Sequence, residues 1–129
     1  MENEVLDKLL DAATEAAEHS YSPYSGFPVG AAVLTADGSI YSGTNVENAS
    51  YGATMCAERV AIFKAVSEGA DKILALAVYT SAAEFAFPCG MCLQVLSEFA
   101  EDIPVIVAGD SGMKTFSLSE LLPHRFGRE

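Results

Sequence analysis

Basic residues are scarce in this sequence, which holds seven lysines and arginines against 18 acidic residues and has a net charge of -11. Binding to nucleic acids rests largely on lysine and arginine side chains at phosphates. The basic residues here are scattered and form no cluster, so we expect no nucleic acid polymer as a partner. The acidity indicates instead a well-solvated surface that favours solubility.

Long hydrophobic runs are also absent. The longest unbroken apolar run is about seven residues, at 73–79, whereas a membrane-spanning helix needs roughly 20. The first residues are acidic where a secretory signal is basic, so we predict a cytoplasmic protein with no membrane partner. Half of the 129 residues are apolar, which excludes a disordered chain and indicates a single domain over 1–129.

Cysteine is rare, and its three occurrences are Cys56, Cys89 and Cys92. Three cysteines cannot all pair, and a reducing cytosol keeps them as thiols. Cys89 and Cys92 form a Cys-x-x-Cys step. Together with one distant cysteine, this step favours a metal site over a disulfide.

Hydrophobic periodicity and turn signals predict alternating helices and strands. Helices are expected over 3–19, 55–68 and 90–100, with a last helical turn over 117–122. Strands are expected over 29–35, 40–44, 73–80 and 105–108, with one more strand after a turn at 109–114. Because strands and helices alternate in the middle of the chain, we predict an α/β fold. Its expected architecture is a three-layer α/β/α arrangement around a five-stranded mixed sheet.

The chemically informative residues lie at the starts of two predicted helices. One helix opens with Cys56-Ala57-Glu58-Arg59, and the other with Pro88-Cys89-Gly90-Met91-Cys92. A helix N-terminus carries partial positive charge, which favours thiolate over thiol. Three thiolates can hold one tetrahedral Zn²⁺ ion per chain and leave a fourth position for water, whose pKa then falls to about 7.

Glu58 follows Cys56 by two residues. This spacing places a carboxylate beside the metal without making it a ligand, where it can take a proton from the bound water and hand it on. The residues therefore indicate a hydrolytic metal site. Two other readings stay open: free structural cysteines, and a purely structural zinc, for which His19 or His124 would supply the fourth ligand.

At these residues the sequence resembles the small cytidine deaminases of nucleoside salvage, over nearly its whole length. The segments that carry the resemblance are Tyr21-Ser22-Pro23-Tyr24-Ser25, Phe27-Pro28-Val29-Gly30-Ala31-Ala32, Asn45-Val46-Glu47-Asn48-Ala49-Ser50-Tyr51 and the two cysteine motifs above. Zinc deaminases share a Pro-Cys-x-x-Cys signature and a glutamate acid/base. The resemblance implies zinc-dependent hydrolytic deamination of cytidine and 2′-deoxycytidine to uridine and 2′-deoxyuridine, with release of ammonia, as in pyrimidine salvage.

The resemblance also implies roles for single residues. Zinc-bound hydroxide attacks C4 of the base, while Glu58 moves protons to N3 and to the leaving amine. Phe27 is expected to pack on the base, and the N–H of Ala57 to meet the pyrimidine O2. Asn45 and Glu47 are expected to hold the ribose 3′-hydroxyl, as sugar recognition requires groups that accept and donate.

Family members with three zinc cysteines resemble compact homotetramers, in which a neighbouring chain helps to close each pocket. By this resemblance Tyr51 and Phe126 are expected to reach into the site of a neighbouring chain. Zinc with three thiolates carries a net charge of about -1, which a hydrogen-bonding cation can offset. Arg59 is expected to be that cation.

The sequence departs from the family pattern at two positions. Arg-Gln usually follows the third cysteine, but this chain has Leu93-Gln94. Arg59 would then offset the thiolate charge alone, and we expect a more basic zinc water with the pH–rate rise shifted upward. Phe87 stands before Pro88 where a small hydroxyl residue is usual, and its ring could narrow the pocket or change which pyrimidines fit.

Two alternatives to cytidine deamination follow from these departures and from the weakness of each motif alone. One is a deaminase of a modified cytosine nucleoside or nucleoside antibiotic. The other is a non-catalytic binding module stabilised by zinc.

Overall fold

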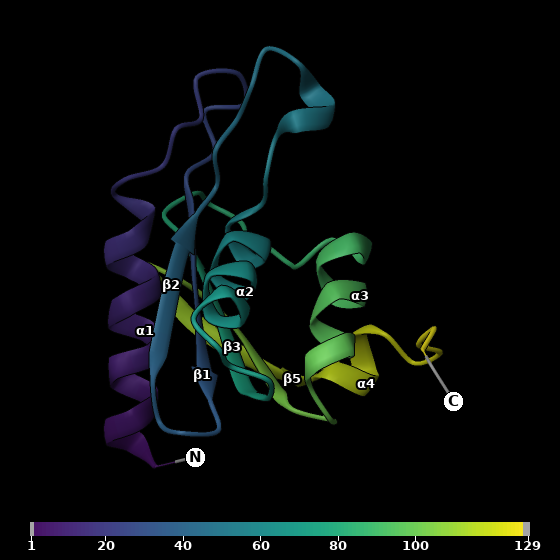
Figure 1. The fold of residues 1–129 in the computed structure, drawn as a ribbon. Coiled ribbons are helices and arrows are strands. Elements are labelled where there is room, and N and C mark those ends of the chain that lie inside the picture. Colours follow the sequence, from purple (N-terminus) through teal and green to yellow (C-terminus); the bar gives the residue numbers. More distant parts are fainter. Residues whose placement is uncertain (1, 128–129) are drawn as a thin grey trace.

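A five-stranded sheet organises the computed structural model, which describes residues 2–127 (Figure 1). Its strands are β1 (Val29–Thr35), β2 (Ile40–Thr44), β3 (Ile73–Thr80), β4 (Pro104–Gly109) and β5 (Gly112–Ser117). They lie in the order β2-β1-β3-β4-β5. β3 and β4 run parallel and the other neighbouring pairs run antiparallel, so the predicted mixed sheet is confirmed.

Helices cover both faces of this sheet. On one face lies α1 (Asn3–Ala17), and on the other lie α2 (Ala57–Ser67) and α3 (Gly90–Phe99), as Figure 1 shows. Successive side chains of a strand point to opposite faces. Accordingly, Ala75 and Ala77 of β3 pack in the cluster under α1, while Leu76 and Val78 pack in the cluster under α2 and α3. The three-layer α/β/α architecture is therefore confirmed.

The predicted bounds of β1, β2 and β3 are confirmed to the residue. Apolar runs mark β1 and β3, and the hairpin turn between β1 and β2 contains Gly38, whose φ of 89° suits glycine. The helix expected over 55–68 begins instead at Ala57, because Met55 pairs with Val46 in an isolated bridge.

The turn predicted at 109–114 was wrong in extent. β4 runs to Gly109 and β5 already begins at Gly112, so the turn comprises residues 110–111. β5 is an edge strand with mostly exposed side chains, and it therefore carries no hydrophobic pattern that sequence reading can detect. The last helical turn is α4 (Leu118–Leu121), which Ser117 and Glu120 cap reciprocally.

The strand directions bring the two cysteine motifs to one end of the sheet. β2 and β3 both run antiparallel to β1, so they are parallel to each other and end at the same edge. β2 leads through the loop 45–56 into α2, and β3 leads through the loop 81–89 into α3. Both helix N-termini therefore lie beyond the carboxyl ends of these strands, where ligands commonly bind in α/β folds.

The loop between β2 and α2 contains a short 3-10 helix, η1 (Tyr51–Ala53), within the segment predicted to be irregular. This loop and the loop 20–28 project together beyond the sheet (Figure 1). None of the helices in residues 2–127 has both the length and the apolar character needed to cross a membrane.

Candidate metal centre and active site

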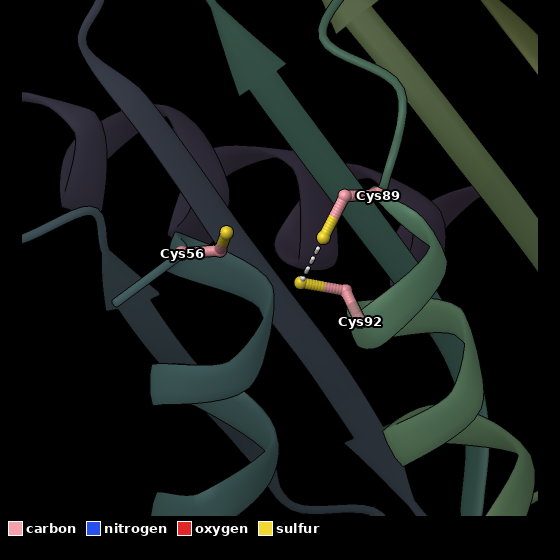
Figure 2. Close-up of side chains that lie close together, drawn as sticks. All are labelled: Cys56, Cys89 and Cys92. Carbon is pink, nitrogen blue, oxygen red and sulfur yellow. Dashed lines mark hydrogen bonds between the residues drawn. The ribbon is translucent and has the colours of Figure 1, made fainter. Parts of the chain in front are cut away.

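The three cysteine sulfurs converge between α2 and α3. Cys56 is the N-cap of α2, Cys89 is the N-cap of α3, and Cys92 lies in the first turn of α3. Their Sγ atoms all lie within 4.8 Å of one another, and Cys89 and Cys92 approach to 3.5 Å (Figure 2). Within residues 2–127 this group of possible metal ligands consists of the three cysteines alone. Neither His19 nor His124 belongs to it.

This donor set fits zinc. A tetrahedral zinc ion with Zn–S distances of about 2.3 Å separates its sulfur ligands by about 3.8 Å. The spacing of the three Sγ atoms, at most 4.8 Å, is close to that value, so small rotations of the side chains suffice to bind the ion. Three protein ligands leave one tetrahedral position open, as catalytic zinc sites do.

The charges around the sulfurs favour a thiolate at Cys56. A hydrogen bond shared with Cys92 and one from Arg59 lower the pKa of Cys56 to about 5, against the effect of burial. The same bond to Cys56, together with burial, raises the pKa of Cys92. Cys56 is therefore the more readily ionised of the two, and zinc binding requires the cysteines to lose their protons.

Arg59 lies beside Cys56 on the first turn of α2. Its Nη2 donates to Cys56 Sγ at 3.4 Å, which also raises the pKa of the guanidinium. Its Nε is buried and has no hydrogen-bond partner among residues 2–127. The contact is the one expected of a cation that offsets thiolate charge.

Glu58 lies on the same turn and is only 5% exposed. Burial is the main reason that its pKa rises to about 7, and the negative charge of nearby Cys56 adds to the rise, while Arg59 opposes it. In the same way, the charge of Glu58 contributes to the raised pKa of Cys92. The carboxyl group is therefore buried next to the sulfurs, and the three cysteines form the metal group without it.

Asn45 connects three parts of the neighbouring loop. Its Oδ1 accepts from Ser20 Oγ at 2.5 Å and from the N–H of Val29 at 3.0 Å, and its Nδ2 donates to the carbonyl of Phe27 at 2.9 Å. Asn45 is buried and both lone pairs of its oxygen are used, whereas Nδ2, which can donate twice, makes this one hydrogen bond among residues 2–127.

Glu47 is held by the turn that precedes Phe27. Its Oε1 accepts from the N–H groups of Tyr24 and Ser25 at 2.9 and 3.1 Å, and its Oε2 accepts from Ser25 Oγ. The bond from the Ser25 hydroxyl holds the pKa of Glu47 below its usual range. The carboxylate is thus fixed and ionised, with lone pairs left to accept from a hydroxyl.

An isolated β-bridge between Val46 and Met55 places Asn45 and Glu47 close to Cys56. Val46, which lies between them, exchanges hydrogen bonds with Met55 at 3.0 and 2.9 Å. Met55 directly precedes Cys56 in the sequence. The Asn/Glu pair and the first zinc cysteine are therefore neighbours in space.

A cavity of about 380 Å³ opens beside Glu47 and is also lined by Tyr24, Ser25, Tyr51 and Thr54. Tyr51 belongs to η1, is 77% exposed and meets the Tyr24 ring edge-on with centroids 6.1 Å apart. Phe27 is 36% exposed, and its backbone is tied to Asn45 and Ser25. Ala57 is fully buried at the first position of α2, where a backbone N–H has no partner within the helix.

Phe126 does not line this cavity. It lines another of about 850 Å³, at the C-terminal end of α3, together with Ser97, Ala100 and Arg125. The cysteines of α3 lie at its other end. The structure therefore brings ten of the sequence-predicted site residues to one end of the sheet and places Phe126 elsewhere on the chain.

The two departures from the family pattern have other packing partners. Leu93 is 7% exposed and belongs to the apolar cluster under α2 and α3. The ring of Phe87 packs edge-on against Phe116 of β5, with centroids 5.5 Å apart. The side chain of an arginine at position 93 would therefore begin in the apolar core. The ring of Phe87 contacts the edge strand β5.

Sequence reading missed the residues that support the site loops and the residues that hold the segment after α4 against α3. It placed Ser20 and Ser25 in a turn-forming loop, and it gave Gln94 and Arg125 no role. Their contacts join side chains to groups 22–32 residues away in the sequence. The one available signal was the density of serines in the loop that precedes Phe27.

Comparisons with known proteins agree with this geometry. Residues 3–109 match the family described as the cytidine and deoxycytidylate deaminase zinc-binding region. A cytidine deaminase of Sporosarcina psychrophila is 44% identical over 126 residues, covering 96% of this chain and 93% of that protein. One of Halalkalibacterium halodurans is 46% identical over 123 residues, covering 94% and 93%. The crystal structure of cytidine deaminase from Burkholderia pseudomallei superposes with a TM-score of 0.88 at 39% identity, covering 98% of this chain and 100% of that one.

Proposed function

The chain belongs to the cytidine and deoxycytidylate deaminase family, and we propose that it deaminates cytidine and 2′-deoxycytidine hydrolytically, giving uridine or 2′-deoxyuridine and ammonia. One observation carries the proposal: three cysteine sulfurs converge at two helix N-termini, beside the buried carboxyl of Glu58. We place the reaction in pyrimidine salvage and in the cytoplasm. Three unpaired cysteines suit a reducing compartment.

Cys56, Cys89 and Cys92 would hold the zinc ion as thiolates. When bound, zinc acidifies a water molecule and so supplies a nucleophile near neutral pH. The dipoles of α2 and α3 point their positive ends at the sulfurs and favour their charged form. Arg59 supports this role, because its hydrogen bond to Cys56 stabilises the thiolate in place.

Glu58 would move the protons. As water adds to C4 of the base, its proton passes to Glu58 and on to N3. The C4–N4 bond then breaks, the remaining hydroxyl proton passes through Glu58 to the leaving amine, and ammonia departs. The position of Glu58 supports the role, since it lies on the first turn of α2, two residues after Cys56, and is shielded from bulk water.

The loops above the metal site would bind the nucleoside. Glu47 and Asn45 would hold the 3′-hydroxyl, the carboxylate accepting and the free amide N–H donating. The N–H of Ala57 would donate to O2 of the base, and the ring of Phe27 would pack on its face. Because these contacts avoid the 2′ position, they accept ribose and deoxyribose alike.

We propose further that the whole chain is one domain and that four copies assemble, each completing the pocket of another with Tyr51 and Phe126. The two apolar clusters share one sheet, which supports the single domain. Tyr51 and Phe126 are 77% and 83% exposed, which supports contacts outside their own copy. A neutral nucleoside needs no basic groove, so the net charge of -11 is compatible with it.

An assay panel tests the function. The zinc content of the purified protein would be measured, and absorbance and ammonia release followed with cytidine, deoxycytidine, methylated cytosine nucleosides and free cytosine. We expect about one zinc per chain and turnover of both unmodified nucleosides. Turnover confined to a modified nucleoside would replace the proposal with the alternative substrate class. Bound zinc without ammonia release from any compound would indicate a binding module.

A further inference from the structure

Two of the three cysteines form a pair within α3 to which the third does not belong. Cys89 and Cys92 are three residues apart, at the N-cap and in the first turn of the helix, and their Sγ atoms approach to 3.5 Å (Figure 2). Cys56 belongs to α2, where its Sγ accepts a hydrogen bond from Arg59 Nη2 at 3.4 Å. The Cys89/Cys92 pair is therefore built by a single turn of one helix.

The backbone of this pair suits a disulfide. Residues three apart at a helix start have Cα atoms about 5 Å apart, as follows from the radius and rise of the α-helix. Disulfides usually join Cα atoms that are about 4.4–6.8 Å apart. Rotation of the two side chains about their Cα–Cβ bonds can therefore bring the sulfurs from 3.5 Å into bonding contact while the helix stays in place.

The two sulfurs differ in how far solvent reaches them. Cys89 is exposed, whereas Cys92 is buried and only 1% exposed. Thiol–disulfide exchange depends on access to the attacking thiol, and Cys89 provides it. A small oxidant therefore meets Cys89 first, and Cys92 lies next to it as the thiol that closes the bond.

We propose that Cys89 and Cys92 are a redox switch that determines whether the chain can hold zinc. A low-molecular-weight disulfide is the oxidant. The Cys89 sulfur attacks one sulfur of that disulfide, whose S–S bond breaks and releases a first thiol, which leaves a mixed disulfide on Cys89. The Cys92 sulfur then attacks the Cys89 sulfur, and the second thiol leaves. The two cysteines are oxidised, the small disulfide is reduced, and the two cysteine protons depart with the two thiols.

The switch acts on zinc because both states use the same sulfurs. A disulfide between Cys89 and Cys92 removes two of the three ligands, and Cys56 alone cannot hold the ion. Zinc binds only the reduced pair, so by linkage zinc opposes the disulfide and the disulfide opposes zinc. A reducing thiol reopens the bond, which protects Cys89 from irreversible oxidation to sulfinic acid. The proposal rests on the zinc site, and only its effect on turnover rests on the proposed function.

Trypsin separates the possible pairings, because it releases Cys56 in peptide 9–59 and both cysteines of the pair in peptide 73–114. The zinc-loaded full chain is incubated with oxidised glutathione and a chromophoric zinc chelator, its free thiols are alkylated, and the peptides are weighed without reduction. We expect an unalkylated peptide 73–114 that has lost one hydrogen from each cysteine, and an alkylated peptide 9–59. A cross-link between the two peptides would overturn the proposal. So would a peptide 73–114 in which either cysteine stays free or keeps glutathione.

The chelator gives a readout that is independent of turnover. We expect zinc release to follow disulfide formation, and the oxidised chain to take up no added zinc until dithiothreitol restores about one zinc per chain. The far-ultraviolet circular dichroism of the oxidised chain should equal that of the reduced chain without zinc, because the bond closes within one helix turn. Loss of the helical signal on oxidation would overturn the switch, since unfolding would then explain the loss of zinc.

Two variants separate the roles of the cysteines. Cys56→Ser leaves the pair intact, and we expect peptide 73–114 to form its disulfide to the same extent as in the original chain. Cys92→Ser removes the thiol that closes the bond, so glutathione should remain on Cys89 as the mixed disulfide. A Cys92→Ser chain that instead links Cys89 to Cys56 as readily would overturn the assignment of the pair.

A titration with mixtures of reduced and oxidised glutathione tests the competition with zinc. We expect added zinc to shift the equilibrium toward the reduced pair, and an equilibrium that zinc leaves unchanged would overturn the switch. Failure of the proposed function looks different. A chain that exchanges zinc for the disulfide but releases no ammonia from any nucleoside when zinc-loaded would overturn the proposed function and support the switch. An active chain whose pair stays reduced in excess oxidised glutathione would overturn the switch alone.

Discussion

Arg59 donates a hydrogen bond from Nη2 to Cys56 Sγ at 3.4 Å, so a cation and a proposed zinc ligand are joined within the first turn of α2. We expect Arg59→Met to weaken zinc binding by roughly 10- to 100-fold, as happens when residues that orient metal ligands are lost. Competition with a chromophoric chelator measures this. Lys64→Met removes a cation from the other end of the helix, and we expect it to leave zinc affinity unchanged.

Glu58→Gln should separate metal binding from turnover. The amide keeps the size of the side chain but cannot transfer protons, so we expect full zinc content and a loss of kcat by roughly 10²- to 10⁴-fold. Metal analysis and the ultraviolet assay with cytidine check the two parts. A variant that keeps kcat within a few-fold would remove Glu58 from the mechanism.

Ser25→Ala should change both the ionisation and the placement of Glu47. The Ser25 hydroxyl is the main cause of the lowered pKa of Glu47, so its removal should raise that pKa toward the ordinary value. The carboxylate of the variant then takes up a proton at a higher pH than in the original chain. A carbon-13 NMR titration of the carboxyl carbon measures the shift, and KM for cytidine should rise because one anchor is lost. Ser50→Ala, whose hydroxyl does not contact Glu47, is the matched control.

Gly43→Ala should disturb the metal site from a distance. A Cβ atom at Gly43 of β2 would lie 2.6 Å from the backbone nitrogen of Ala61 and 2.8 Å from Val60 Cβ, so α2 must move away from the sheet. We expect a loss of about 1–3 kcal/mol in stability, together with weaker zinc binding, since Cys56 moves with the helix. Thermal unfolding with and without zinc measures both effects. A Cβ atom at Gly52 meets nothing within 4 Å, and Gly52→Ala should unfold like the original chain.

The layers of the fold and the metal ligands could be predicted from the sequence because each leaves a local mark. Apolar runs define β1 and β3, and a Cys-x-x-Cys step at a helix start places two sulfurs together. The exposed edge strand β5 leaves no such mark, and its start at Gly112 was missed.

The supporting contacts could not be predicted for a different reason. The bonds of Ser25 to Glu47 and of Gln94 to Phe126 join polar residues far apart in the sequence. Such pairs follow no hydrophobic period and depend on the path of at least one loop or tail segment, which only the folded chain determines. The same holds for Leu93, whose burial shows that an apparent change in the active-site pattern is also a change in the core.

The placement of Phe126 beside the far end of α3 has a consequence for how the protein behaves in dilute solution. If Tyr51 and Phe126 of another copy complete each binding site, a single dissociated copy still binds zinc but binds nucleoside poorly. Specific activity would then fall as total protein is lowered through the dissociation range, while the metal-to-chain ratio stays constant.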